Sequence, residues 1–279
     1  MPQPSAPASP YYPRRAEFWR ELGAVEPTRL ASRTYPVQGL AMHGRSSIAP
    51  GEGLPFVLIH GLVISSLYMI PLAEYLAVRH PVHAVDLPGF GRSEAPGEIL
   101  TLPQLADAVL EWMTAAGIER CHLMGNSLGC EIAAHLAVRA PERVASLVLV
   151  GPTLDPAAMA VTTQTLRLLW DAWHEPKRLW LNWAFDFFRA GLLRALGMTR
   201  EMFRDHIENQ LPRLQCPTVV VRGGQDPTVP QAAAETLTRL IPQRRLLVLP
   251  TEPHCAHYTA PAAVGRIMEE LAAQCESPR

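Results

Sequence analysis

Short, wholly apolar runs alternate with longer stretches of helical periodicity along most of this chain, and this alternation constrains its fold more than any other feature. Runs that are apolar throughout and bounded by Gly, Pro or Asp predict strands that are covered on both faces. Such runs occupy residues 56–60, 82–86, 121–125, 145–150, 218–222 and 246–249. Apolar residues recur at helical spacing in residues 102–116, 128–139, 229–240 and 261–273. The pattern predicts an α/β fold in which helices flank a mostly parallel central sheet.

Three other segments complete the predicted organisation. Residues 33–39 and 41–47 predict an antiparallel hairpin at the edge of the sheet. Residues 1–30 begin with a run rich in Pro, Ala and Ser, and we expect a tail followed by a leading helix. Residues 152–212 show helical patterns without a strand and hold four of the six Trp, which predicts an all-helical cap, or lid, over the sheet. The core would then comprise residues 31–151 and 213–279.

Composition and charge exclude several classes of protein. The 279 residues carry a formal net charge of −1, so the basic field that nucleic acids require is absent. The five Cys are odd in number and no pair has C-x-x-C spacing, which predicts a reduced protein without disulfides or a zinc site. No apolar run approaches the ~20 residues that span a bilayer, and residues 1–13 lack the pattern of a signal peptide. We therefore expect a cytoplasmic protein.

A candidate nucleophile stands between a predicted strand and a predicted helix. Residues 125–129 read G-N-S-L-G and match G-x-S-x-G, with Ser127 at the centre. In this motif the Ser sits on a sharp strand-to-helix turn that projects its Oγ above the sheet edge, and the flanking glycines let strand and helix approach closely. The positive end of the following helix also points at the site and suits a developing oxyanion. We expect Ser127 to attack an acyl carbon.

Acid and base candidates follow the last two predicted strands. Asp226 lies in G-G-Q-D-P directly after a strand, where its carboxylate can reach the crevice at the carboxyl edge of the sheet. The loop after the last strand offers His254 and His257 as the base. The chain order Ser, Asp, His is one of the known orders of Ser-His-Asp triads, so we favour Ser127, Asp226 and His254. Asp155 after the preceding strand remains an alternative acid.

Two backbone amides are expected to hold the oxyanion that acyl transfer creates. One is that of Leu128, the residue after the nucleophile. The other should come from the earlier loop of residues 60–63, H-G-L-V, with Leu62 as the favoured donor and Val63 as the alternative. His60 ends a strand beside a Gly, and we expect it to hold this loop by hydrogen bonds rather than act as the base.

Together these segments resemble the α/β-hydrolase fold superfamily, in particular serine hydrolases and esterases with a helical cap. The resemblance covers about residues 56–273 and rests on four motifs in order: H-G-L-V at 60–63, D-L-P-G-F-G-R-S at 86–93, G-N-S-L-G at 125–129 and G-G-Q-D-P at 223–227. In this family the base His usually precedes a Pro by seven residues, as His254 precedes Pro261, which favours it over His257. Asp86 is expected to form a turn and to take no part in the chemistry.

The resemblance implies a Ser-His-Asp enzyme that hydrolyses a small-molecule carboxylic ester through an acyl-enzyme, without a metal or organic cofactor. The aromatic residues of the predicted cap favour a mostly apolar acyl group. C–C bond hydrolysis of the aromatic-degradation type, lactone opening and acyl transfer on the same site remain alternatives. A non-catalytic ligand receptor is a further one. We expect no nucleic-acid partner, no membrane span, and a monomer or homodimer.

Overall fold

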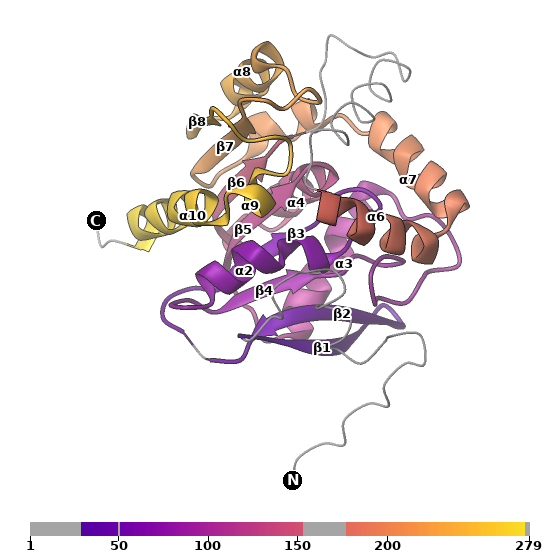
Figure 1. Cartoon of the computed structure of the whole chain (residues 1–279). Coiled ribbons are helices and arrows are strands. Elements are labelled where there is room, and N and C mark those ends of the chain that lie inside the picture. Colours follow the sequence, from indigo (N-terminus) through magenta and orange to yellow (C-terminus); the bar gives the residue numbers. More distant parts are fainter. Residues whose placement is uncertain (1–28, 50, 153–176, 277–279) are drawn as a thin grey trace.

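The computed structural model describes residues 29–49, 51–152 and 177–276, whose strands form one eight-stranded sheet (Figure 1). The strands are β1 Leu30–Val37, β2 Leu40–Ser47, β3 Phe56–Ile59, β4 Val82–Val85, β5 Cys121–Asn126, β6 Val144–Val150, β7 Thr218–Gly223 and β8 Arg244–Leu249. Their order across the sheet is β1-β2-β4-β3-β5-β6-β7-β8. Strands β3 to β8 run parallel, whereas β2 pairs antiparallel with both β1 and β4. The predicted mostly parallel sheet and edge hairpin are confirmed.

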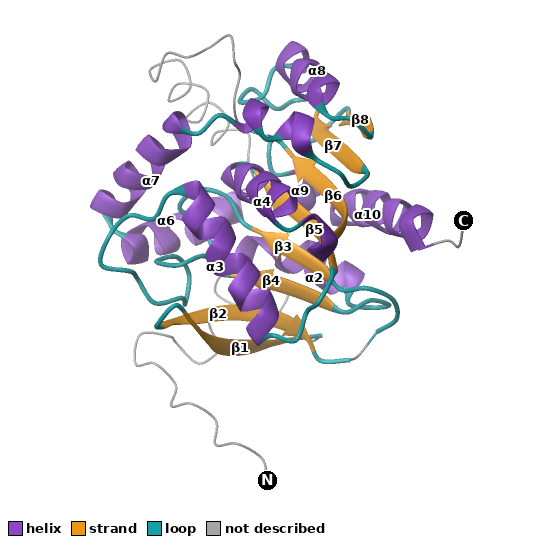
Figure 2. Cartoon of the chain, turned by 180° about the vertical axis from the view of Figure 1, so that it is seen from behind, coloured by secondary structure: helices purple, strands orange, loops and turns teal. Residues whose placement is uncertain are grey.

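Helices cover both faces of this sheet (Figures 1 and 2). The α-helices are α2 Ile70–Leu76, α3 Leu102–Ala115, α4 Leu128–Arg139, α6 Lys177–Ala190, α7 Leu192–Arg204, α8 Gln231–Leu240, α9 Ala256–Thr259 and α10 Pro261–Glu276. Short 3-10 helices are η1 Ser66–Met69, η2 Pro141–Arg143, η3 Ile207–Asn209 and η4 Leu211–Arg213. Helices α3 and α4 lie over one face, and α2 and α10 lie over the other (Figures 1 and 2). The flanking helices predicted from the sequence are thereby confirmed.

The apolar runs of the sequence are buried because both faces of their strands are covered. In β3, Val57 and Ile59 belong to the apolar cluster beneath α3 and α4, whereas Phe56 and Leu58 belong to the cluster beneath α2 and α10. All four side chains are almost completely buried. Successive side chains of a strand point to opposite faces, so a strand between two helical layers must be apolar throughout.

The connection from β6 to β7 carries the helical segment that the sequence predicts as a cap. Within its described part, α6 and α7 lie beyond the carboxyl edge of the sheet (Figure 1). Helix α7 buries Ala195, Met198 and Met202 against the cluster beneath α3 and α4. Residues 153–176, with Asp155 and two of the Trp, lie outside the described residues, as do residues 1–28, where the tail and leading helix are predicted. No helix in the described part of the chain is long and apolar enough to cross a membrane.

Element boundaries depart from the sequence predictions where the apolar signal is weak. Strand β8 begins at Arg244, two residues before the predicted start, because this edge strand is partly exposed and opens with two arginines. Helix α8 begins at Gln231 rather than at residue 229, since Pro230 disfavours helical backbone at the residue before it and itself serves as the N-cap with an extended ψ of 150°. The consecutive short helices η1 and α2 have no counterpart among the predicted elements.

Candidate active site

Ser127 forms the turn between β5 and α4 that the G-x-S-x-G motif predicts. Its backbone lies at φ 55° and ψ −126°, a conformation that costs a non-glycine residue free energy. A Cβ on Gly125 would collide with the Gly129 carbonyl oxygen, and one on Gly129 would collide with the Ile59 carbonyl oxygen. The two glycines therefore let strand, helix and neighbouring strand approach closely enough to hold the strained Ser127 in place.

Asp226 and His254 are brought together across the ends of β7 and β8. The His254 Nδ1 atom lies 2.8 Å from Asp226 Oδ2, and both side chains are almost completely buried. The other carboxylate oxygen accepts hydrogen bonds from the amides of Thr228 (2.7 Å) and Val229 (3.0 Å). Burial would raise the pKa of Asp226, but the imidazole and the two amides outweigh it and hold the pKa below its usual value. The carboxylate is thus ionised and can fix the imidazole tautomer.

Close backbone contact explains why these two loops meet. A Cβ on Gly223 would collide with the Pro253 carbonyl oxygen, so only glycine lets the end of β7 lie against the histidine loop. Arg222 organises the acid loop by donating to the carbonyl oxygens of Val229 (2.6 Å) and Asp226 (3.0 Å). The G-G-Q-D-P motif therefore encodes both the approach of the two loops and the direction of the carboxylate.

Ser127 and His254 lie on either side of the end of β6. The Ser127 amide donates to the Val150 carbonyl oxygen at 3.1 Å. The next residue, Gly151, lies against the imidazole, where a Cβ would be 2.8 Å from His254 Nδ1. The three residues predicted as a triad therefore gather at the carboxyl ends of the adjacent strands β5, β6 and β7 and of β8.

The loop after β3 approaches the same site. The Leu62 side chain is half-buried, and the next residue, Val63, has a left-handed φ of 52°. His60 at the start of the loop donates from one ring nitrogen to the Gly61 carbonyl oxygen (2.8 Å) and accepts from the Leu87 amide (3.0 Å) with the other. Burial lowers the pKa of His60, which keeps the ring neutral. Both ring nitrogens are thus used in holding the loop, as expected from the sequence.

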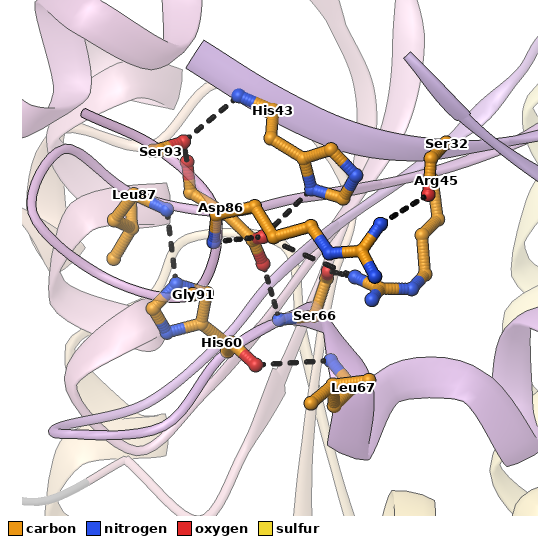
Figure 3. Close-up of polar contacts among 12 residues, drawn as sticks. Ser32, His43, Arg45, His60, Ser66, Leu67, Asp86, Leu87, Gly91 and Ser93 are labelled. Carbon is orange, nitrogen blue, oxygen red and sulfur yellow. Dashed lines mark hydrogen bonds and ion pairs between the residues drawn. The ribbon is translucent and has the colours of Figure 1, made fainter. Parts of the chain in front are cut away.

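Asp86 holds the far end of this loop through a buried polar cluster (Figure 3). Its carboxylate accepts from the Ser66 amide (2.7 Å) and the Arg92 amide (2.9 Å) and lies 2.7 Å from His43 Nδ1. Burial would raise the pKa of Asp86, but His43 and Arg45 outweigh it and hold the pKa below its usual value. From the sequence we expect Asp86 only to form a turn. Its contact with β2 depends on strand pairing, which no local motif encodes.

His257, the alternative base, takes part in an aromatic contact. Its ring packs edge-to-face on Tyr68 with centroids 4.6 Å apart, and neither ring nitrogen has a hydrogen-bond partner within the described residues. Burial, with a smaller effect of His254, lowers the pKa of His257 to about 3, so its ring is neutral. The Asp226 carboxylate contacts His254 instead. The alternative acid, Asp155, lies outside the described residues.

Leu128 is the first residue of α4, so its amide has no acceptor within the helix. Together with the loop after β3, it can present backbone donors beside Ser127 Oγ. Among the residues that the structure describes, no three or more His, Cys, Asp or Glu side chains form a group suited to a metal ion. The arrangement is suited to nucleophilic attack, proton transfer and oxyanion stabilisation by the chain's own groups.

Comparison with known proteins agrees with the observed fold. A family model described as alpha/beta hydrolase fold matches residues 55–196. Over 251 residues the chain is 30% identical to a pimeloyl-[acyl-carrier protein] methyl ester esterase of Aeromonas hydrophila, covering 79% of this chain and 96% of that protein. A thermophilic esterase from Thermogutta terrifontis superposes with a TM-score of 0.71 at 22% identity, over 88% of this chain and 100% of that one.

A meta-cleavage product hydrolase from Pseudomonas fluorescens has a TM-score of 0.68 at 21% identity, over 89% of this chain and 99% of that one. At such identities these solved structures bear on the fold alone. The family model spans half of the chain, and the Aeromonas relative is matched along almost its whole length. This chain therefore belongs to the α/β-hydrolase fold family.

Proposed function

We propose that this protein is an esterase that cleaves carboxylic esters with Ser127 as nucleophile, His254 as base and Asp226 as the residue that orients the base. The observation that carries the proposal is the placement of a strained Ser127 after β5 and of a buried Asp226–His254 pair after β7 and β8, at the same edge of the sheet. The similarity to a named methyl ester esterase over most of the chain supports ester hydrolysis. No metal or organic cofactor enters the proposed reaction.

The proposed reaction forms one acyl–oxygen bond at Ser127 and then breaks it. His254 Nε2 removes the hydroxyl proton as Ser127 Oγ attacks the carbonyl carbon, and the amides of Leu62 and Leu128 stabilise the negative oxygen. Collapse of this intermediate breaks the ester C–O bond, and the alcohol leaves with the proton from His254. A water molecule, deprotonated by the same imidazole, then attacks the acyl-enzyme. The bond from the acyl carbon to Ser127 Oγ breaks, Oγ takes the proton back from His254, and the carboxylic acid is released. Asp226 stabilises the imidazolium in both halves.

We propose that residues 152–212 form a cap that lines an apolar acyl site. Two aromatic side chains of α6, Trp183 and Phe187, stack with ring centroids 5.1 Å apart. Phe187 and Leu62 both pack against the apolar cluster beneath α3 and α4, which supports an apolar lining between the cap and the loop after β3. The name of the Aeromonas relative specifies an ester of an acyl chain, and an apolar acyl group agrees with that chemistry.

Two further properties complete the proposal. The described cysteines form no disulfide, and burial raises the pKa of Cys121 to about 12, which suppresses thiolate chemistry. The free thiols support the part of the proposal that places the protein in a reducing compartment, the cytoplasm. Action on a small-molecule ester as a monomer or homodimer is the remaining part of the proposal.

The first test is hydrolysis of p-nitrophenyl esters from acetate to long acyl chains. We expect wild type to hydrolyse them and Ser127→Ala to lose at least about a thousandfold in kcat. Ser146→Ala is the matched control, because it removes the hydroxyl of a buried serine on β6 that contacts His122 and takes no part in the proposed reaction. Activity retained in Ser127→Ala, or no activity at any chain length from folded wild type, would contradict the proposal. Highest activity on charged esters would contradict its apolar acyl site.

A further inference from the structure

Tyr68, on the short helix η1, connects the two loops that the proposed oxyanion donors occupy. The Gly61 amide donates to the Tyr68 hydroxyl at 2.7 Å, and this hydroxyl donates to Asn126 Oδ1 at 2.6 Å. Gly61 belongs to the loop after β3, and Asn126 directly precedes Ser127. We infer that the Tyr68 hydroxyl is a positioning group for acyl transfer, because it fixes the spacing between the Leu62 and Leu128 amides. The inference rests on the proposed function.

The hydrogen bond to Tyr68 determines which amide of the first loop can face an oxyanion. The Gly61 N–H group is engaged by the phenol oxygen and cannot point at substrate. Consecutive peptide planes are linked through two dihedral angles, so fixing the Gly61 amide restricts the orientation of the next one, that of Leu62. The space is also tight, because a Cβ on Gly61 would lie 3.0 Å from the Tyr68 hydroxyl and 3.1 Å from Ser127 Cβ.

The second hydrogen bond reaches the nucleophile through the Asn126 side chain. Asn126 Nδ2 donates to the Val150 carbonyl oxygen at 3.0 Å, and the same oxygen accepts from the Ser127 amide at 3.1 Å. The Asn126 amide group is therefore fixed between Tyr68 and the end of β6. A continuous buried path of hydrogen bonds runs from Gly61 through Tyr68 and Asn126 to the turn that carries Ser127.

Backbone strain makes such a connection necessary. Val63 is β-branched and lies at φ 52°, and Ser127 lies at φ 55°. Both conformations cost free energy and persist only where surrounding contacts fix them. His60 and Ser66 hold the two ends of the first loop on the Asp86–Leu87 segment, and the Tyr68 hydroxyl joins that loop to the serine turn.

The ring of Tyr68 is itself held in place by packing. Tyr68 is almost completely buried, and the His257 ring lies against it at an interplanar angle of 89°. Because His257 is neutral and its ring nitrogens have no hydrogen-bond partner among the described residues, its role here is to pack as an aromatic ring against Tyr68. Removal of the hydroxyl alone should therefore leave the ring in place and free the two loops from one another.

The test compares Tyr68→Phe with wild type in two assays. The first is steady-state hydrolysis of a p-nitrophenyl ester, and the second is the rate at which a fluorophosphonate labels Ser127. We expect kcat and the labelling rate to fall about tenfold to a hundredfold, less than loss of a whole oxyanion donor, with KM within about twofold. Tyr75→Phe is the control, since its hydroxyl contacts Glu269 on α10, and it should keep both rates.

If the Tyr68 hydroxyl had only a structural role, Tyr68→Phe would lower the melting temperature without lowering kcat selectively over KM. Equal rates in wild type and Tyr68→Phe, or an equal fall in Tyr75→Phe, would overturn the inference and leave the esterase proposal intact. A wild-type protein that is neither labelled nor active would overturn both. If Tyr68→Phe does not fold, Asn126→Ala removes the acceptor of the same hydroxyl, and an unchanged labelling rate there would overturn the inference.

Discussion

Asp186 should make the stability of this protein depend on pH in the opposite direction to an ordinary paired carboxylate. It lies on α6 with its side chain almost completely buried, and neither carboxylate oxygen has a hydrogen-bond partner within the described residues. Burial raises the pKa of Asp186 to about 7, and nearby Asp86 adds to the rise. Ser65, Arg45 and Arg189 oppose it without removing it. The substitution to make is Asp186→Asn, which keeps the shape and removes the ionisation.

The magnitude follows from the difference in pKa between the folded and unfolded states. At about 1.4 kcal/mol for each unit of pKa, a rise from 3.8 to about 7 corresponds to a cost of about 4 kcal/mol when Asp186 is fully ionised in the folded state. Between these two values the folded protein binds a proton that the unfolded chain has released. The free energy of unfolding should therefore fall as pH rises through this window, and the cost should be complete above about pH 7.

Urea unfolding followed by circular dichroism at pH 5 and pH 8 measures this effect. We expect the stability of Asp186→Asn relative to wild type to rise by about 3 kcal/mol between these two pH values. The unpaired amide of Asn costs the same at both pH values and cancels from the comparison. Glu98→Gln, which removes an exposed carboxylate, should follow wild type at both. A constant offset between wild type and Asp186→Asn would refute the reasoning.

Two other substitutions separate the roles assigned to the acid and to the second histidine. Asp226→Asn should lower kcat about ten-thousandfold, because the amide cannot hold His254 in the required tautomer. Steady-state kinetics on the folded variant would measure this loss. A fall in kcat of less than about tenfold would point to another acid. His257→Phe keeps an aromatic ring against Tyr68 and removes two buried nitrogens without hydrogen-bond partners among the described residues. It should leave kcat within about threefold and the melting temperature unchanged or higher. A loss of a thousandfold would identify His257 as the base.

The predictions from sequence succeeded where a short local pattern carries the physical requirement. The apolar runs placed most strands of the sheet, and the glycines of residues 125–129 identified the serine turn, because close backbone approach there tolerates no side chain. The Asp226–His254 contact follows from two motifs at the ends of neighbouring strands.

Contacts that form only when distant segments of the chain come together could not be predicted, because no short local pattern in the sequence marks them. Tyr68 meets Gly61 and Asn126 only once the loop after β3 and the serine turn are side by side, and nothing near it in the sequence marks it as polar in function. The cluster around Asp86 likewise requires β2 to pair with β4. Burial of the Asp186 carboxylate, on a helix rich in aromatic residues, also cannot be predicted from the sequence, because it depends on how that helix packs against the core.

The connection between β6 and β7 leaves the sheet after Val150 and re-enters it at Thr218, which pairs with Leu147 on the neighbouring strand. The two strands are parallel and paired, so the sheet fixes the positions of both ends of the connecting segment, and doubling the length of such a segment costs only about 0.6 kcal/mol in closure entropy. Ser127, Asp226 and His254 all lie outside it. We therefore expect that a segment from a relative can be grafted between Gly151 and Thr218, which would exchange the proposed cap and leave the proposed catalytic residues unchanged.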